Sequence, residues 1–411
     1  MNKLPKIPIA RPCVTNHERL DENITRILAS GALTKGRWLR ELEENAAEYL
    51  GVKHAIAVSS GTTGLMLAYQ ALELQGEAIV PSFTFMATAS ALVWARVRPV
   101  FVESDFRSKN IDPEAITRQI TPQTTAIVAV HNFGNPAPIA ELQEIANRHN
   151  LKLIFDAAHA FGATYQHQPI GSQGDVHVFS LSPTKLVVAG EGGIIATNCD
   201  DLAKRLRLAR EYGNDGTYDS VLVGLNGRLP EISALLAVES LRALDSAVEN
   251  RNTYAAFYQR ELRKLPGIGF QEVRSDDCSA YKDFVITIDE DQFGLSRDEL
   301  MTALAAENID TRSYYNPPVH LQTSYRRFAG HDLPVTEKLA RQCLSLPMWS
   351  QMESGILERI CATIKGIQRN CEEIRDQPAR RARATISVQP HGPDDMTAGS
   401  ADECEFLAGV G

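Results

Sequence analysis

One lysine, Lys185, occupies an unusual place between two apolar segments. The segment "DVHVF" (175–179) precedes it, and "GEGG" (190–193) leads into "IIAT" (194–197). Considered alone, such a lysine is most simply explained as a side chain whose ammonium reaches water at the end of a strand. An amine held between buried strands can also act as a nucleophile that forms a Schiff base with a carbonyl compound. Other residues of the chain are needed to distinguish these two explanations.

An acid and an imidazole precede Lys185 in the segment "LIFDAAHAFG" (153–162). Asp156 ends an apolar run that is typical of a buried strand, and His159 follows three residues later. Taken alone, Asp156 is better explained as a turn or helix-capping residue, and His159 as a buried imidazole whose hydrogen bonds are satisfied. Both nevertheless follow the same strand, where a ligand of an α/β sheet would lie.

Small and hydroxyl-bearing residues form the segment "SSGTTG" (59–64), between an apolar strand and an amphipathic helix. Free backbone N–H groups and the helix dipole make such a helix start an anion site, to which Thr62 and Thr63 add hydroxyl groups. Ordinary N-capping is the alternative explanation. Phe85, in "VPSFTF" (80–85), follows another strand, where an aromatic ring belongs either to the core or to a stacking surface.

Taken together, these features match the requirements of pyridoxal 5'-phosphate (PLP). This cofactor needs an amine for a Schiff base, an acid at its pyridine nitrogen, a phosphate site and a ring-stacking partner. Lys185 and Asp156, which are 29 residues apart, meet the first two requirements. The helix start at 60–64 and Phe85 meet the others. We therefore predict a PLP site in which Lys185 is catalytic.

The elements that would position these groups follow an alternating pattern. Helical periodicity covers about 15–50, and short apolar strands then alternate with helices up to about 197. This order predicts an α/β fold with a mostly parallel sheet, with ligands at the carboxyl ends of its strands. We expect an N-terminal extension (1–14), a large PLP-binding α/β domain (15–250), a smaller α+β C-terminal domain (251–376) and a disordered tail (377–411).

Composition narrows the classes of function. The 411 residues are 44% hydrophobic and 23% charged, as in ordinary globular proteins, and the net charge of −9 argues against general nucleic-acid binding. The seven cysteines include no CxxC pair, so neither a disulfide framework nor a cysteine-rich zinc site is expected. We expect no metal, no signal peptide and no transmembrane helix, which makes the cytoplasm the expected location.

The chain resembles the DegT/StrS-type sugar aminotransferases from about residue 33 to 347. Besides the motifs above, "FSLSPTKLVVAGEGG" (179–193), "GLNGRLPEISA" (224–234) and "YYNPPVHLQ" (314–322) fall in the family's order. This resemblance implies the PLP-dependent transferase fold type I and a homodimer with shared active sites. The roles that it implies are Schiff-base formation by Lys185, pyridine-nitrogen binding by Asp156, ring contacts by His159 and Phe85, and phosphate binding by Thr62, Thr63, Ser180 and, from the neighbouring subunit, Asn226.

The resemblance also implies transamination with ping-pong kinetics, in which Lys185 moves a proton between the donor's α-carbon and the cofactor. The substrate expected is a nucleotide-linked 4-keto-6-deoxy sugar, with glutamate or glutamine as the donor; a keto-cyclitol is the alternative. We expect Tyr315 and His320 to contact the sugar, although plain packing of their proline-rich loop explains them as well. Where many relatives have "HATK", this chain has "SPTK", a change that could reshape the substrate side of the lysine.

The sequence fits three other functions less well. Related dehydratases that remove a sugar hydroxyl carry histidine at the lysine position, so Lys185 favours transamination. A non-catalytic sensor of the same fold has no support from a DNA-binding or membrane segment. A nucleotide-phosphate cradle made of "SSGTTG" and "GEGG" would leave Lys185 and Asp156 unexplained.

Overall fold

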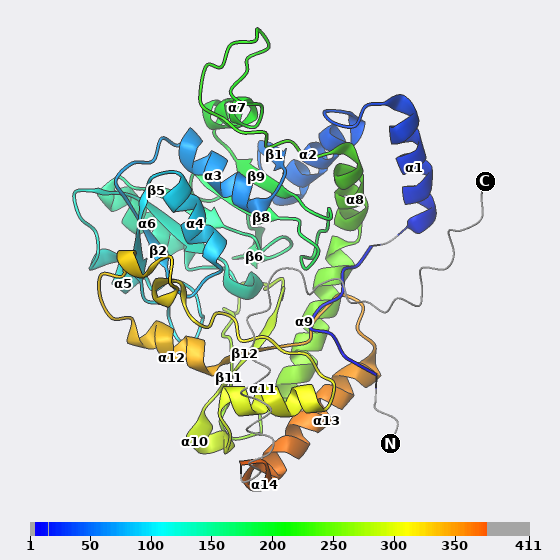
Figure 1. Cartoon of the computed structure of the whole chain (residues 1–411), viewed down its shortest axis with the longest axis vertical. Coiled ribbons are helices and arrows are strands. Elements are labelled where there is room, and N and C mark those ends of the chain that lie inside the picture. The colour runs from blue at the N-terminus through cyan, green and yellow to red at the C-terminus, as the bar shows by residue number, and fades with distance from the viewer. Residues whose placement is uncertain (1–4, 15, 376–411) are drawn as a thin grey trace.

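The computed structural model describes residues 5–14 and 16–375, so the predicted tail at 377–411 lies outside the described residues. Two sheets organise this part of the chain (Figure 1). A seven-stranded sheet lies in the large N-terminal domain, and a three-stranded sheet lies in a smaller domain below it.

The large sheet has the strand order β1-β9-β8-β5-β4-β2-β3. Its pairs from β3 to β8 are parallel, and only β9 runs antiparallel to both of its neighbours. The predicted α/β fold with a mostly parallel sheet is therefore confirmed. The strands are β1 (His54–Val58), β2 (Glu77–Pro81), β3 (Arg98–Val102), β4 (Thr124–Val130), β5 (Lys152–Asp156), β8 (Val176–Ser180) and β9 (Gly193–Thr197).

Helices cover both faces of this sheet, which is why its strands are apolar without strict alternation. Successive strand residues point to opposite faces, so Phe155 packs in one hydrophobic core and Ile154 in the other. The first core includes α2 (Arg37–Leu50), α5 (Pro113–Thr117), α6 (Ile139–His149) and α8 (Glu231–Arg242). The second includes α3 (Gly61–Ala71), α4 (Met86–Trp94) and α7 (Asp200–Ala209).

The small domain is an antiparallel sheet in the order β10-β11-β12, packed against helices. Its strands are β10 (Ile268–Phe270), β11 (Phe284–Ile288) and β12 (Cys343–Leu346). Its helices are α10 (Glu290–Phe293), α11 (Arg297–Ala306), α12 (Pro334–Gln342), α13 (Ser354–Arg369) and α14 (Cys371–Arg375). Short 3-10 turns lie at Asn132–Gly134, Val319–Leu321 and Arg326–Phe328, and a two-stranded hairpin consists of β6 (Thr164–Tyr165) and β7 (Gln168–Pro169).

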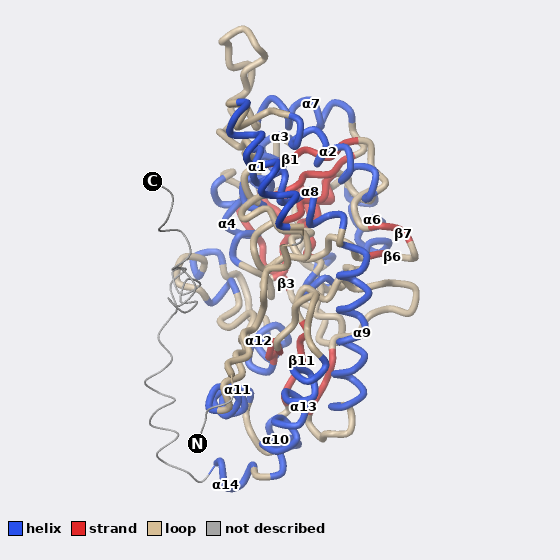
Figure 2. The backbone as a smooth tube through the Cα atoms, turned by 90° about the vertical axis from the view of Figure 1, so that its right-hand side faces the viewer, coloured by secondary structure: helices blue, strands red, loops and turns tan. Residues whose placement is uncertain are grey.

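One long helix, α9 (Leu244–Leu262), runs between the two domains (Figure 2). The division predicted at 250/251 falls inside this helix. The N-terminal extension belongs to the small domain, because Ile7 pairs with Ile309 and packs in that domain's core. The main chain thus enters the small domain at both ends of the described sequence.

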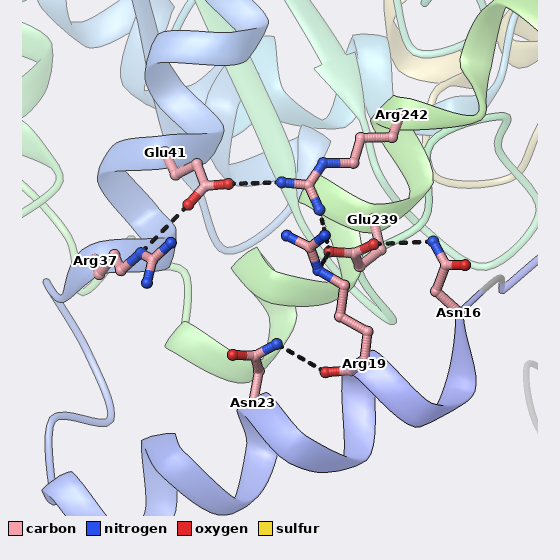
Figure 3. A network of polar contacts seen from close by, with 7 residues as sticks. All are labelled: Asn16, Arg19, Asn23, Arg37, Glu41, Glu239 and Arg242. Atoms are coloured by element: carbon pink, nitrogen blue, oxygen red, sulfur yellow. Dashed lines mark hydrogen bonds and ion pairs between the residues drawn. The ribbon is translucent and has the colours of Figure 1, made fainter.

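Two polar networks attach the first helices to the large domain. Helix α1 (His17–Ser30) is held by the buried carboxylate of Glu239 on α8, which pairs with Arg19 at 2.9 Å and Arg242 at 2.5 Å (Figure 3). Arg242 also reaches Glu41 on α2 at 2.9 Å, so one buried acid links three helices. Because every partner of Glu239 is charged or polar, its burial is compensated.

The start of α2 is capped from a distance by Glu231, the first residue of α8. Its carboxylate accepts hydrogen bonds from the N–H groups of Gly36, Trp38 and Leu39 at 2.8–3.0 Å. These donors have no partner within their own helix, and a carboxylate there also interacts favourably with the helix dipole. The arrangement fixes α2 against α8 at the edge of the sheet.

Candidate active site

A cavity of about 450 Å³ opens where the parallel strands of the large sheet end and the small domain begins. Asp156 is the last residue of β5, and Ser180 is the last residue of β8. Val130, at the end of β4, also lines the cavity. The structure brings together in this cavity most of the predicted site residues: Thr62, Phe85, Asp156, His159, Ser180, Lys185 and Tyr315.

Asp156 is buried, and its carboxylate accepts hydrogen bonds from two groups. Its Oδ2 accepts from Thr88 Oγ1 at 2.7 Å, and its Oδ1 accepts from the N–H of Ala158 at 3.1 Å. Burial raises the pKa of Asp156, and the opposing effects of the two hydrogen bonds and of Lys185 are smaller. The carboxylate therefore lies in a site where a cationic N–H group, such as a protonated pyridine, would stabilise it.

Lys185 extends into the cavity from the loop that follows β8. Burial lowers the pKa of its ammonium to about 7, and the nearby cation of Lys282 adds to this effect. An ordinary lysine amine is protonated at neutral pH, whereas the buried environment of Lys185 favours its neutral form. A neutral amine is the form that attacks a carbonyl carbon.

His159 is held as a neutral ring. Its Nδ1 accepts a hydrogen bond from the N–H of Phe133 at 3.2 Å, so the proton of the neutral imidazole belongs on Nε2. Burial, together with the cations of Lys185 and Lys282, keeps the pKa of His159 well below its usual value. The ring can therefore donate one hydrogen bond into the site without carrying a charge.

The first turn of α3 provides the expected anion site. The N–H groups of Gly61 and Thr62 lie in the first turn, where no intrahelical acceptor exists. Ser180 lies close to Gly61: a Cβ atom at Gly61 would be only 3.1 Å from the Cβ atom of Ser180. Free N–H groups, two hydroxyl side chains and a helix N-terminus suit a phosphate group.

Thr63, in contrast, lies behind this anion site and is not among the residues that line the cavity. Its N–H donates to Ser60 Oγ at 3.0 Å. Its hydroxyl group contacts Ser60 Oγ at 2.9 Å and Ser59 Oγ at 3.2 Å. Both of its polar groups are therefore engaged in fixing the first turn of α3.

Phe85 has the environment of a stacking surface rather than that of a core residue. Its side chain is 52% exposed at the start of α4, although it lies inside the cavity. Large aromatic rings are usually buried, and a planar ligand would cover this one. Phe85, Asp156, Lys185 and the anion site together fit PLP.

The structure places two other predicted residues away from the cavity. Asn226 lies in an exposed loop, where its backbone pairs with Glu211. His320 is buried, with its Nδ1 2.6 Å from Ser82 Oγ and its Nε2 3.6 Å from Glu337. His320 thus attaches the proline-rich loop to the end of β2.

Tyr315, from the same loop as His320, does line the cavity. Its ring stacks on Phe133 with centroids 5.6 Å apart and meets the edge of Phe83 at 5.3 Å. Burial raises the pKa of Tyr315 well above its usual value, so the phenol stays protonated and can donate a hydrogen bond.

Sequence reasoning missed the charged residues that line the cavity from the small domain. Lys282 and Asp283 precede β11, and Tyr314 lies against Lys282, with Nζ 5.4 Å from the ring centroid. Two adjacent opposite charges before an apolar strand are typical of a solvated strand start, so the sequence carried no signal for them. Glu191 of the "GEGG" segment also lines the cavity.

The described residues, 5–14 and 16–375, contain neither a metal-ligand cluster nor a membrane-spanning helix. There, no group of three or more His, Cys, Asp or Glu side chains is arranged to hold a metal ion. No helix within those ranges has the length and apolar character needed to cross a bilayer.

Comparison with known proteins identifies the family. Residues 14–365 match the DegT/DnrJ/EryC1/StrS aminotransferase family. The GDP-perosamine synthase of Caulobacter vibrioides is 34% identical, over 89% of this chain and 99% of its own length. The dTDP-3-amino-3,4,6-trideoxy-alpha-D-glucose transaminase of Streptomyces venezuelae is 38% identical, over 84% of this chain and 91% of its own length.

Solved structures agree with these matches. DesI, crystallised in the presence of its TDP-sugar product, superposes with a TM-score of 0.84 and 35% identity, over 93% of this chain and 95% of that one. DesV of S. venezuelae, in complex with a ketimine intermediate, superposes with a TM-score of 0.83 and 34% sequence identity. The match covers 89% of this chain and 99% of the DesV chain. The chain therefore belongs to the DegT/DnrJ/EryC1/StrS aminotransferase family, and it is an aminotransferase whose cofactor is PLP.

Proposed function

We propose that this aminotransferase converts a nucleotide-linked keto sugar into an amino sugar, with an amino acid as the amino donor. The observation that carries the proposal is the cavity that joins the Lys185 amine, of depressed pKa, to the buried Asp156 carboxylate. The relatives whose names mention GDP or dTDP sugars support the substrate class. Lys185 also argues against the related dehydratases, which carry histidine at that position.

The residues that would hold the cofactor follow from the geometry. Ser180, Thr62 and the first N–H groups of α3 would bind its phosphate, and Phe85 would stack on its ring. Asp156 would keep a proton on its pyridine nitrogen. When bound, PLP supplies a carbonyl group for amines and a conjugated ring that takes up the electrons of a carbanion.

The remaining steps belong to the chain's own side chains. The Lys185 amine would take the proton from the donor's α-carbon and later return a proton to the sugar carbon, work that typically contributes ~10²–10⁴-fold. His159 would donate its Nε2–H toward the cofactor's phenolic oxygen. Tyr315, with a protonated phenol in the cavity, would hydrogen-bond the sugar. His320, hydrogen-bonded to Ser82, would position the loop that carries Tyr315.

The experiment is a panel assay with purified holoenzyme. Nucleotide-linked 4-keto-6-deoxy sugars and keto-cyclitols are each incubated with L-glutamate or L-glutamine, and amino products are identified by mass spectrometry. We expect an amino sugar nucleotide and parallel lines in double-reciprocal plots, as ping-pong kinetics requires. Exclusive conversion of cyclitols would overturn the proposed substrate class and support the alternative.

The proposal includes a homodimer with shared active sites. Asn226 lies in an exposed loop, and Arg228 follows it two residues later. The segment before Asn226 projects from the large domain (Figure 1). Two apolar side chains of that segment are strongly exposed, Tyr218 at 99% and Val223 at 75%. Exposed apolar side chains beside a predicted cofactor contact favour a protein–protein interface.

Sedimentation velocity tests the assembly. The wild type should sediment as a dimer, and Val223→Asp should shift it toward the monomer and weaken PLP binding, because Asn226 would leave the neighbouring site. A matched substitution at an exposed valine outside the segment, Val335→Asp, should leave the dimer unchanged. An active wild-type monomer at the assay concentration would contradict the shared site.

A further inference from the structure

A buried ion pair of adjacent residues lines the small-domain side of the cavity. Lys282 Nζ lies 3.0 Å from both carboxylate oxygens of Asp283. Each side chain is only 7% exposed, and both line the same cavity as Lys185. Lys282 lowers the pKa values of Lys185 and His159 as a nearby cation, but neither Lys282 nor Asp283 is among the residues that would hold the cofactor.

The backbone of this pair is held rigidly. Arg251, buried on α9, donates through Nη1 to the carbonyl oxygens of Tyr281 and Lys282 at 2.9 and 3.0 Å. The N–H of Lys282 donates to the carbonyl oxygen of Phe133, in the large domain, at 2.9 Å. The two charges are therefore fixed in place before any substrate arrives, which is the condition for efficient recognition.

The pair does not connect parts of the fold. Its two members are neighbours in sequence, so their ion pair links no separate elements, unlike the bridge of Glu239 to Arg19. Burying two charges is costly, and replacing such a pair by apolar side chains is often neutral or stabilising. A contribution to stability therefore does not explain why these charges face the cavity.

Unused hydrogen-bonding capacity faces the cavity at this point. A lysine ammonium has three N–H donors, and a carboxylate has about four acceptor positions. In the part of the chain that the structure describes, the hydrogen bonds of Lys282 Nζ go to Asp283 alone. A ligand can thus bind to the ammonium without first displacing a second protein group.

The charges around the cavity indicate which ligand needs this ammonium. Lys185 and Lys282 are the lysines among its described lining residues, which include no arginine. Asp156, Asp283 and Glu191 place three carboxyl groups there. Because Lys185 reacts with the cofactor, Lys282 is the cation that the described lining of this chain leaves to attract an anionic group past these acids.

We propose that Lys282 binds the α-carboxylate of the amino donor, and that Asp283 holds the ammonium in position when no donor is present. This inference rests on the proposed transamination. The α-carboxylate is bonded directly to the carbon from which Lys185 would take a proton, so it must lie near Lys185. A nucleotide diphosphate is separated from the reacting carbon by the sugar ring and does not share this constraint.

The same pair would also suit the second substrate. A keto sugar brings hydroxyl groups rather than a carboxylate to the reacting end. The re-formed pair is then neutral as a unit, and Asp283 still offers acceptor positions to hydroxyl groups. One site could thus accept an anionic donor and an uncharged sugar ring in turn, as a ping-pong enzyme requires.

The decisive variant is Lys282→Met, which keeps the length of the side chain and removes the charge. The donor half-reaction is followed by the cofactor absorbance with L-glutamate and with isoglutamine, in which the α-carboxylate is an uncharged amide. The wild type should prefer glutamate, and Lys282→Met should lose roughly 10- to 100-fold in glutamate affinity, the value of a charged hydrogen bond. Its affinity for isoglutamine should hardly change.

A binding measurement without turnover provides the second readout. Calorimetry with 2-methylglutamate, which has no α-hydrogen, should show the same loss for Lys282→Met. Lys338→Met is the matched control: Lys338 also lies over an aromatic ring, 5.2 Å from the centroid of Phe106, but does not line the cavity. Should Lys282→Met fold poorly, the double variant K282M/D283N removes both charges and repeats the test.

The outcomes separate this inference from the proposed function. A wild type that no amino acid converts would refute the proposed function itself. If the wild type turns over normally but Lys282→Met binds glutamate as tightly as the wild type and prefers it over isoglutamine to the same extent, only the role of Lys282 is refuted. A rise confined to the Michaelis constant of the sugar nucleotide would show that the cation serves an anionic group of the sugar instead.

Discussion

The two sides of the active-site cavity are built differently. The large-domain side consists of groups at the ends of parallel strands, and burial shifts Asp156, His159 and Lys185 toward their uncharged forms. The small-domain side consists of two short segments, 282–283 and 314–315, which present an ion pair and two tyrosines. The first side suits proton transfer near neutral pH, and the second suits the recognition of charged and hydroxylated substrates.

The difference suggests a division of labour. A sheet edge is shared by every strand that ends there, so it can hold one cofactor in one orientation. Loop segments of a separate domain can change without disturbing the sheet, which makes them suited to substrate choice. Substitutions on the two sides of the cavity test this division.

Replacing Lys185 by Ala should have the largest effect, because it removes both the covalent attachment and the proton carrier. The rate of transamination should fall by more than the roughly 10²–10⁴-fold that loss of an acid–base group alone costs. The visible absorbance of the protein-linked cofactor should also disappear, although PLP can still bind through its phosphate. Lys338→Ala should retain both properties, and near-normal turnover of Lys185→Ala would refute the assignment.

Asp156→Asn should come second. The amide cannot stabilise a protonated pyridine, and loss of such an electrostatic contact costs roughly 10²–10³-fold in rate. Thr88→Val keeps the carboxylate and removes only one hydrogen bond, so the expected loss is roughly tenfold. Single-turnover absorbance measurements give both values; equal losses in the two variants would mean that the charge of Asp156 contributes little.

Lowering the pH should reduce the free energy of unfolding through the large-domain sheet beneath the cavity. His131, Phe155 and His177 stack there on neighbouring strands, and burial lowers the pKa of His131 to about 3 and that of His177 well below its usual value. The unfolded chain takes up these protons near pH ~6.5. Stability is therefore complete above that pH and decreases as the pH falls toward 3, by up to about 1.4 kcal/mol per pH unit for each ring.

Urea unfolding between pH 7.5 and 4.5 measures this dependence. His177→Phe should reduce the slope, because both ring nitrogens of His177 are buried without a partner among the described residues. His149→Gln, on the exposed end of α6, is the control and should leave the slope unchanged. An identical slope in wild type and His177→Phe would assign the acid sensitivity to other groups.

His320→Ala should have the smallest effect and distinguishes two roles. If His320 contacts the sugar, as the sequence predicts, the Michaelis constant for the sugar should rise roughly three- to tenfold. The donor half-reaction should then stay near normal. Its contacts with Ser82 and Glu337 favour a positioning role, which would affect both half-reactions equally. Gln322→Ala, an exposed change in the same loop, is the control.

The sequence by itself predicted the large-domain sheet and the residues that its edge presents. This was possible because Asp156 and Phe85 lie at or just after strand ends, and parallel strands bring such residues to one edge. The role of Ser180 was implied by the resemblance to the sugar aminotransferases. Local patterns also located the first turn of α3. The inference needed no knowledge of long-range packing beyond the strand–helix alternation.

The residues on the opposite side of the cavity are placed there by tertiary contacts. Lys282 and Asp283 look like solvent-facing residues in sequence, but Arg251 and the carbonyl of Phe133 fix their backbone against the large domain. His320, predicted as a substrate contact, is buried and hydrogen-bonded to Ser82. Two of these contacts, Phe133 with Lys282 and Ser82 with His320, join residues more than 100 positions apart, and no local pattern encodes such contacts.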